Sequence, residues 1–348
     1  MGAGREAFMK KKVTFADIAA YTNFSKTTIS RYFNDPDSLT LENQEKIARA
    51  LEELGYQENK LAKVLANGKT EFIGIIIPNL YLHYYTETLN QILLSYEQYN
   101  YKFLVFVAQD NPELERKYIR ELLAYKIEGL IVLSHALSSG ELAAYDIPVV
   151  TIERESEFVC GISTDNYMGG VQAASLLMKN ECDILFHINA VFPQNVPAYQ
   201  RIRGFEDTCV QEKSRYHIIQ RDMGESYSAT QEQIREIFTE IEEGYPDLKK
   251  GIFLANDTYA NIFLKLVIQK YGGLPKEYRL IGFDDSPIAS ESIVPITTIG
   301  QQIDKLVQNA MELLILQMEE QKKRAPKPLE KPLHRQIAPI LVRRETTD

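Results

Sequence analysis

Polar side chains follow several apolar runs of this 348-residue sequence, at the points where those runs end. Asp165 comes after GIST, Asn256 after GIFLA and Asp284 after LIGF. If these runs are parallel strands, their carboxyl ends meet at one edge of a sheet, where open α/β sheets bind ligands. Arg201 stands near the start of an expected helix over 199–212 and adds a cation. The four side chains are therefore candidates for one binding site.

Aromatic residues could complete this site. Tyr84 and Tyr85 lie in an aromatic-rich loop after the first apolar run, and Tyr227 is a further candidate because the chain has no tryptophan. Carboxylates, an amide and a guanidinium exchange hydrogen bonds with hydroxyl groups, while aromatic rings pack against sugar rings. The set therefore suits a sugar-like effector. The alternative is that an aspartate after a strand caps the next helix, which we favour for Asp257 and Asp285.

Catalysis finds little support in the sequence. The five histidines lack metal-ligand spacing, and neither a G-x-S-x-G motif nor a glycine-rich phosphate loop occurs. Three scattered cysteines are too few for a disulfide framework or a metal site. Paired carboxylates alone do not make a glycosidase. We expect no catalytic residue, metal or cofactor, and a sugar-metabolising enzyme is the rival class.

A second polar group lies near the beginning of the chain, on two short helical patterns joined by a tight turn. Thr14 and Asp17 have the spacing of a capping box, Asn23 suits a left-handed turn, and Ser25 can cap a second helix over 26–33. The outward face of that helix is polar, with Lys26, Thr27, Thr28, Ser30 and Arg31. Such a pair is typical of a helix-turn-helix, whose second helix enters the major groove of double-stranded DNA.

Charge is distributed unevenly along the chain. The net charge is −9, yet residues 10–34 carry five basic residues against Asp17 alone. A local basic face on an acidic protein suits phosphate contact at one place. A third helix is expected over 41–54, which completes a small unit over 13–58. Residues 1–12 form an extension without the apolar core of a secretory signal, and no apolar run could span a membrane.

Apolar runs alternate with helical patterns from residue 72 onward. Continuous apolar strands separated by helices of ten to fifteen residues predict a parallel sheet covered on both faces. Two such sets follow in series, so we expect an α/β core of two doubly wound subdomains with a cleft between them. The expected strands are 72–77, 101–107, 129–133, 148–152, 183–188, 217–220, 251–255 and 280–283.

The N-terminal motif also resembles a known family. The order V-T-x-x-D-I-A, followed by S-x-x-T-I-S-R-x-x-N, is similar to the headpiece of lactose-repressor-type (LacI/GalR) transcription regulators. A plain helical hairpin is the alternative. The resemblance implies a helix-turn-helix headpiece over 13–58 and a hinge helix over 59–70 that orders when two copies meet on DNA. The implied DNA contacts are Thr14, Ser25, Lys26, Thr27, Thr28, Ser30, Arg31, Asn34, Asn59, Ala62 and Leu65.

In that family one hinge leucine enters the minor groove, and Leu65 falls on this position; a plain flexible tether is the alternative. The resemblance further implies a periplasmic-binding-protein-like core. Its N-subdomain is expected over 71–161 and 291–322, and its C-subdomain over 162–290 and 323–348. The family's effector motifs match Arg201 in R-x-x-G, Asn256 in N-D and Asp284 in D-D. The complete expected effector set is Tyr84, Tyr85, Asp165, Arg201, Tyr227, Asn256 and Asp284.

Together these features predict a cytoplasmic homodimer that represses carbohydrate-metabolism genes from a pseudo-palindromic operator. A sugar or sugar derivative in the cleft is expected to control operator binding. The same fold using a purine or another metabolite as corepressor is the alternative effector class. A transporter's sugar-binding protein shares the core pattern, but such a protein needs export and lacks a headpiece.

Overall fold

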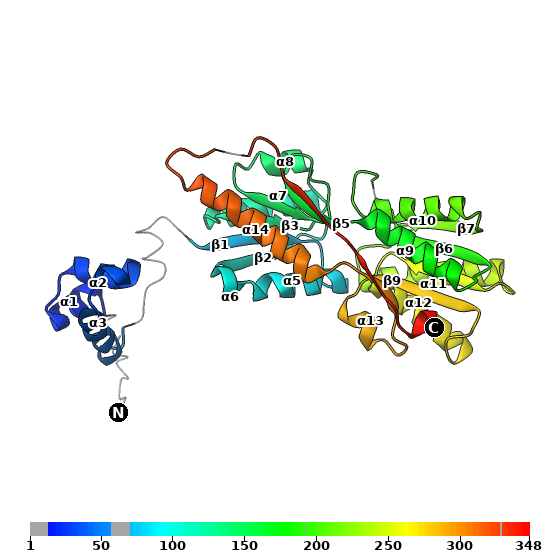
Figure 1. Cartoon of the computed structure of the whole chain (residues 1–348), viewed down its shortest axis with the longest axis horizontal. Coiled ribbons are helices and arrows are strands. Elements are labelled where there is room, and N and C mark those ends of the chain that lie inside the picture. Colours follow the sequence, from blue (N-terminus) through cyan, green and yellow to red (C-terminus); the bar gives the residue numbers. More distant parts are fainter. Residues whose placement is uncertain (1–12, 57–69, 192, 328) are drawn as a thin grey trace, which may run out of the picture. The chain divides into compact units, whose positions relative to one another are not determined.

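The computed structural model describes residues 13–56, 70–191, 193–327 and 329–348, which form two compact units that divide after residue 69 (Figure 1). The first unit is the helical headpiece and the second is the α/β core. The expected extension over 1–12 and the hinge residues Asn59, Ala62 and Leu65 lie outside the described residues.

Three helices build the headpiece around a small apolar centre. They are α1 (Phe15–Thr22), α2 (Lys26–Asn34) and α3 (Leu41–Glu53), with the 3-10 turn η1 (Pro36–Ser38) between the last two. Ile18, Ile29 and Ile47 are fully buried, one from each helix. The rings of Phe15 and Phe33 stack at 5.2 Å beside them. A core this small is marginal by itself, as expected for a unit of about 45 residues.

The predicted starts of α1 and α2 and the turn between them are confirmed. Thr14 and Asp17 form a capping box, and Asn23 has φ 60°, the left-handed conformation expected of the turn. The Ser25 hydroxyl accepts a hydrogen bond from the Thr28 amide at 3.0 Å. This cap fixes where α2 begins, and with it the register of the outward polar face.

The first sheet of the core has the order β11-β5-β4-β3-β1-β2, with every pair parallel. Helices α5 and α14 pack on one face, and α7 and α8 on the other. The strands are β1 (Phe72–Ile77), β2 (Lys102–Val107), β3 (Gly129–Val132), β4 (Val149–Ile152), β5 (Cys160–Thr164) and β11 (His334–Ile337). The helices are α5 (His83–Leu94), α6 (Tyr96–Tyr99), α7 (Pro112–Ala124), α8 (Ser139–Ala143) and α14 (Ile303–Gln321).

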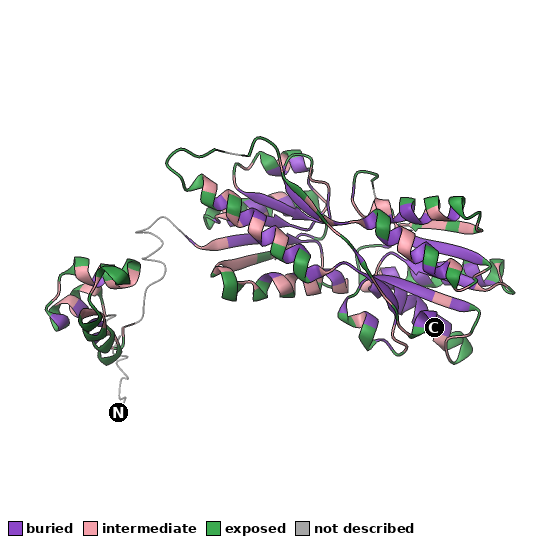
Figure 2. Cartoon of the chain, viewed as in Figure 1, coloured by how far each residue is buried: buried purple, intermediate pink, exposed green. Residues whose placement is uncertain are grey.

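The second sheet has the order β12-β10-β9-β8-β6-β7, parallel except for the antiparallel pair β10–β12. Helices α11 and α12 cover one face, and α9 and α10 the other. The strands are β6 (Ile184–Ala190), β7 (Tyr216–Arg221), β8 (Lys250–Leu254), β9 (Tyr278–Asp284), β10 (Thr297–Gly300) and β12 (Ile340–Val342). The other elements are α9 (Asn166–Lys179), α10 (Tyr199–Gln211), α11 (Tyr227–Gly244), α12 (Asp257–Tyr271), α13 (Pro287–Glu291) and the 3-10 turn η2 (Glu345–Thr347). Figure 2 shows the inner strands of both sheets buried and the outward helix faces exposed.

The subdomain boundaries differ from those expected. Residues 297–300 were assigned to the N-subdomain, but they form β10 and pair with β9 in the second sheet. Residues 334–337 were assigned to the C-subdomain, but they form β11 and pair with β5, which ends at Thr164 rather than before residue 162. The chain therefore crosses between subdomains after Thr164, after Gly300 and after Ile337.

None of the helices in the described ranges is long and apolar enough to cross a membrane.

Candidate functional site

A cleft lies where the strand orders of both sheets reverse. The orders β2-β1-β3-β4-β5 and β7-β6-β8-β9-β10 switch direction between β1 and β3 and between β6 and β8. Ligands bind at such switch points, beyond the carboxyl ends of the strands. A cavity of about 80 Å³ occupies this place. It is lined by Leu82, Tyr84, Tyr85, His135, Glu153, Asn189, Ala190, Ala198, Arg201, Ala255, Asn256, Tyr259, Asp284 and Gln301.

Five of the seven expected effector residues line this cavity: Tyr84, Tyr85, Arg201, Asn256 and Asp284. The other two expected residues are absent from its wall.

Asp165 and Tyr227 lie outside the lining of this cavity, and each has other contacts. The Asp165 carboxylate accepts a hydrogen bond from the Met168 amide at 3.0 Å and thereby caps α9. Its neighbour Asn166 is the residue that turns toward the cleft arginine. Tyr227 begins α11 and packs against the apolar cluster beneath that helix.

Arg201 is buried, and its guanidinium is held on every side by protein. Its Nε donates to the Asn166 side chain and its Nη1 to the Ala255 carbonyl, both at 2.6 Å. Nη2 lies 3.8 Å from the Glu153 carboxylate. The guanidinium carbon also sits 3.6 Å from the centre of the Phe283 ring. Arg201 thus joins the two subdomains, because Glu153 follows β4 of the first sheet.

Two glycines allow this arginine to reach its place. A Cβ on Gly204 of α10 would lie 2.0 Å from the Tyr167 carbonyl oxygen of α9. A Cβ on Gly170 of α9 would lie 2.2 Å from the Arg201 carbonyl oxygen. The backbones of α9 and α10 can therefore touch only because both positions lack a side chain. This contact is the structural reason for glycine in the R-x-x-G motif.

Asp284 lies at the end of β9 and takes part in a hydrogen-bonded chain between the sheets. Gln301 donates to its carboxylate at 2.6 Å and accepts from the Thr164 hydroxyl at 2.7 Å. Burial, together with the nearby Asp257 carboxyl, raises the pKa of Asp284 well above its ordinary value, and Arg201 opposes that rise. Asp284 itself has φ 111°, a left-handed value that directs the chain away from the strand.

Asn256 has two roles at the carboxyl end of β8. Its side-chain oxygen accepts from the Tyr259 amide at 2.8 Å, which caps α12, while the residue also lines the cavity. Asp257 is fully buried behind the wall, where Thr298 and Ser286 donate to its carboxylate.

Sequence reasoning missed several wall residues. Glu153 follows the expected strand 148–152 and Asn189 follows 183–188, so the strand-end signal that selected Asn256 was present for both. Gln301 follows β10, a strand that was not expected, and no simple signal identified it. The Glu153 carboxylate accepts from the Thr164 amide and, at 2.9 Å, from the Asn166 side chain. It thereby anchors the wall at the first crossing.

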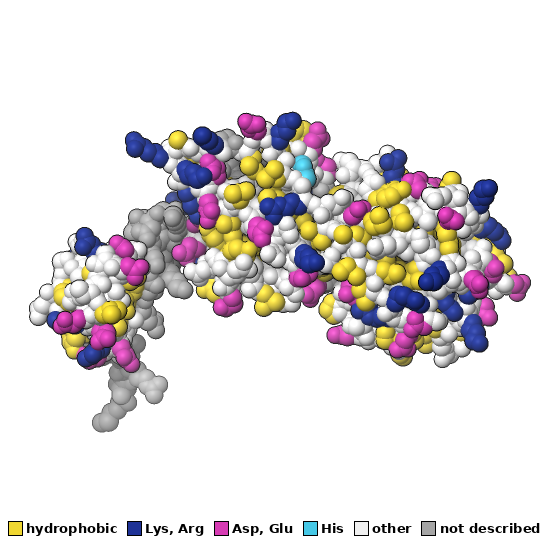
Figure 3. Space-filling model, in the orientation of Figure 1, with side chains coloured by type: hydrophobic (Ala, Val, Ile, Leu, Met, Phe, Trp, Pro, Cys, Tyr) yellow, Lys and Arg dark blue, Asp and Glu magenta, His cyan; other side chains and the backbone are white. Residues whose placement is uncertain are grey.

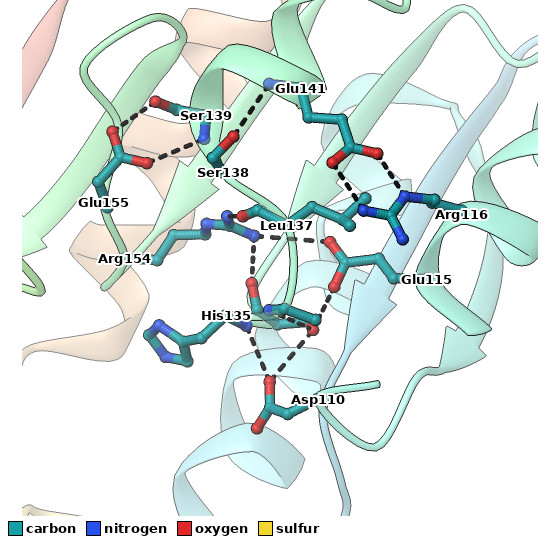
Figure 4. A network of polar contacts seen from close by, with 12 residues as sticks. Asp110, Glu115, Arg116, His135, Leu137, Ser138, Ser139, Glu141, Arg154 and Glu155 are labelled. Carbon is teal, nitrogen blue, oxygen red and sulfur yellow. Dashed lines mark hydrogen bonds and ion pairs between the residues drawn. The ribbon is translucent and has the colours of Figure 1, made fainter. Parts of the chain in front are cut away.

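A buried polar network supports the N-subdomain wall behind His135 (Figure 4). Arg154 donates to the carbonyls of Ser134 and Leu137 and lies 3.6 Å from the buried Glu115 carboxylate. Asp110 accepts from the His135 amide at 2.8 Å. Burial lowers the pKa of His135 to about 4, so its imidazole is neutral at pH 7. The network fixes the loop after β3 that contributes His135 to the cavity.

The two subdomains also touch at the cleft mouth. The His83 amide and its Nδ1 lie 3.2 and 2.9 Å from the Thr258 hydroxyl, across from α5 to α12. Tyr81 Oη lies 3.4 Å from the Gly224 carbonyl. The cleft is therefore closed in this structure.

The headpiece presents a separate candidate site on α2. Thr14, Ser25, Lys26, Thr27, Arg31 and Asn34 are exposed, whereas Thr28 and Ser30 are half-buried. The Asn34 amide donates to the Ser30 carbonyl at 3.0 Å, within its own helix. Lys26, Thr27 and Arg31 thus form the freely accessible polar face expected of a recognition helix.

The visible face of the core carries no comparable basic surface. Figure 3 shows Lys and Arg side chains interspersed with Asp and Glu over that face. Within the residues that the structure describes, no group of three or more His, Cys, Asp or Glu side chains is placed to hold a metal ion.

Comparison with known proteins gives matches to both parts. The family model described as bacterial regulatory proteins, lacI family, matches residues 14–59, and that described as a periplasmic binding protein-like domain matches residues 182–347. The sucrose operon repressor of Streptococcus mutans is 29% identical over 306 residues, 88% of this chain and 92% of that protein. The ribose operon repressor of Halalkalibacterium halodurans is 26% identical over 96% of this chain and 97% of its own length.

A solved structure has the same fold over nearly the whole chain. The lac repressor dimer, bound to operator and an anti-inducer, superposes with a TM-score of 0.80 at 21% identity and covers 97% of this chain and 99% of its own. The lacI-type match lies on the helix-turn-helix, and the binding-protein match lies on the sheet that supplies Arg201, Asn256 and Asp284. The chain is thus a member of the LacI family, a DNA-binding transcriptional regulator with a periplasmic-binding-protein-like core and not an enzyme.

Proposed function

We propose that this regulator binds a pseudo-palindromic operator as a homodimer and that a sugar or sugar derivative in the cleft changes its affinity for that operator. The observation that carries the proposal is the presence, in one chain, of an exposed recognition helix and of a cleft at the switch points of two sheets. The relatives named as sucrose and ribose operon repressors support a sugar as the effector class. We infer a cytoplasmic location for the protein, because operator DNA lies in that compartment.

Each part of the chain has one role in this proposal. The headpiece over 13–58 reads base edges through Lys26, Thr27 and Arg31, with phosphate contacts around them. The hinge over 59–70, including Asn59, Ala62 and Leu65, links the headpiece to the core and contacts the minor groove. The cleft contacts the effector through Tyr84, Tyr85, Arg201, Asn256 and Asp284.

The test begins by selecting operator sequences from random DNA with the full chain. Binding of the selected DNA is then measured with and without each member of a panel of sugars and purines, together with the melting temperature of the protein. A ligand that binds only the folded state raises that temperature. We expect a sugar to raise it and to change operator affinity by a coupling of about 1–3 kcal/mol. A response to purines alone would replace the sugar by the purine alternative.

A further inference from the structure

We propose that the effector is an uncharged polyhydroxylated molecule, one hydroxyl of which binds to Oη of Tyr84, and that phosphorylated or carboxylated sugars are rejected. This inference rests on the proposed function, because it concerns the ligand of the same cleft. The inference restricts the effector to uncharged ligands and assigns Tyr84 Oη as one hydrogen-bond donor to the ligand.

The first observation is a hydroxyl group without a partner. Tyr84 lines the cavity and is only 8% exposed, yet its Oη makes no hydrogen bond with any residue that the structure describes. The hydroxyl of Thr88, one turn further along α5, donates to the Tyr84 main-chain carbonyl at 2.8 Å. A buried hydroxyl left unpaired costs about 1–3 kcal/mol. A ligand hydroxyl in the cavity would remove this cost.

The Tyr84 hydroxyl remains a neutral donor. Burial raises its pKa well above the ordinary value, and the charges of Glu153 and Asp284 act in the same direction. The phenol therefore keeps its proton at physiological pH and can donate to a hydroxyl oxygen of the ligand.

The second observation is that the only cation among the lining residues is already neutralised. Arg201 donates to Asn166 and Ala255 and turns Nη2 toward the Glu153 carboxylate. The neighbouring buried cation, Arg154, is outside the cavity wall and is matched with Glu115 (Figure 4). An anionic ligand would have to share Arg201 with the Glu153 carboxylate, which already offsets the guanidinium charge.

The carboxylates of the wall point to the same conclusion. Glu153 lines the cavity, so a phosphate or carboxylate bound there would lie near its carboxylate in a poorly solvated place. A cationic ligand would also gain little binding free energy. Glu153 already accepts hydrogen bonds from Thr164 and Asn166, and Asp284 already accepts one from Gln301. With the charges compensated inside the protein, a neutral ligand costs least to bind.

The experiment compares matched neutral and charged ligands on the full chain by calorimetry and thermal shift. The panel pairs glucose with glucose 6-phosphate, gluconate and glucosamine, fructose with fructose 6-phosphate, and ribose with ribose 5-phosphate, and it adds sucrose and hypoxanthine. We expect a neutral sugar to bind at least tenfold more tightly than its charged derivatives. Tyr84→Phe should weaken binding of that sugar about tenfold while the unliganded protein melts at the same temperature or higher.

Tyr278→Phe is the matched control, because this buried phenol has a partner, the Glu242 carboxylate, and neither residue lines the cavity. That variant should melt at a lower temperature and bind the sugar as the parent does. A charged derivative that binds more tightly than its neutral parent, or unchanged affinity in Tyr84→Phe, would overturn this inference while leaving an effector-controlled regulator intact. If no sugar of either kind binds, the proposed effector class itself is wrong.

Discussion

At the scale of a single residue, Asp257 shows that ionising a carboxyl group buried behind the cleft lowers the stability of the folded state. Its carboxyl is fully buried and accepts from Thr298 and Ser286, yet burial raises its pKa from 3.8 to about 7. The folded state therefore binds a proton that the unfolded chain releases near pH 4. Stability consequently falls as the pH rises from about 4 to about 7, and the full cost of the buried charge is present above pH 7.

Asp257→Asn should remove this dependence. The amide stays uncharged, so the melting temperature of the variant relative to the parent should rise steadily between pH 4 and pH 8, by the equivalent of a few kcal/mol. The difference in stability between the variant and the parent at any one pH also includes the effect of altered hydrogen bonds, but that effect does not change with pH. Thermal unfolding across this pH range checks the prediction, and parallel curves for the two proteins would contradict it.

At the same scale, we expect Lys26 and Thr27 to decide which bases the headpiece prefers. Both are exposed at the start of α2, and a lost base contact of good geometry costs about 1–3 kcal/mol. Alanine at either position should change which bases are selected from random DNA, whereas alanine at exposed Glu52 of α3 should not. Selections identical to the parent's in both α2 variants would remove these residues from the base-reading set.

Cleft residues at strand ends could be predicted from the sequence only where a polar residue directly follows an apolar strand. Asn256 and Asp284 follow apolar strands, and parallel strands bring their carboxyl ends together. Asp165 has the same pattern and caps α9, just as Asn256 caps α12, but only Asn256 also lines the cavity. Whether a side chain at a strand end also lines the cavity depends on the direction of the chain after the strand. That direction is set by where the chain crosses between the subdomains rather than by neighbouring residues.

At the scale of elements, the contact between α9 and α10 positions the cleft arginine. Gly204→Ala places a methyl group against the Tyr167 carbonyl, so the helices must separate. We expect a destabilisation of about 1–3 kcal/mol and a loss of effector affinity, since Arg201 moves with α10. Gly244→Ala, at the end of α11 with open space around it, is the control and should be neutral or slightly stabilising. Chemical denaturation and calorimetry measure both, and parent-like values for Gly204→Ala would refute the role of this contact.

Strand β10 was not predicted from the sequence, and the reason is physical. β10 is only four residues long, and Thr297 and Thr298 give it a polar appearance in the sequence. Both residues are fully buried, with their hydroxyls paired to the Arg344 carbonyl and to Asp257. Partners that lie about forty to fifty residues away cannot be read from a local pattern. The long apolar strands and amphipathic helices, which need no such partners to be recognised, were predicted with small shifts at their ends.

At the scale of the whole core, we expect effector binding to be linked to closure of the cleft. Arg201–Glu153, Thr164–Gln301–Asp284 and His83–Thr258 all join the two subdomains. The apparent affinity of a ligand falls in proportion to the fraction of molecules that are closed. Contacts that never touch the ligand can therefore tune the response.

Thr258→Ala tests this link because Thr258 lies outside the cavity wall and its hydroxyl contacts His83 across the cleft. Loss of this contact costs the closed form about 1 kcal/mol, so the apparent effector affinity should fall up to about fivefold. Small-angle scattering should show a larger radius of gyration without ligand, and a saturating effector should restore the parent value. Thr239→Ala, which removes an exposed hydroxyl bonded within α11, is the control and should change neither quantity. If affinity falls in Thr258→Ala but the radius of gyration does not change, Thr258 acts on the ligand directly; if neither changes, closure does not depend on this contact.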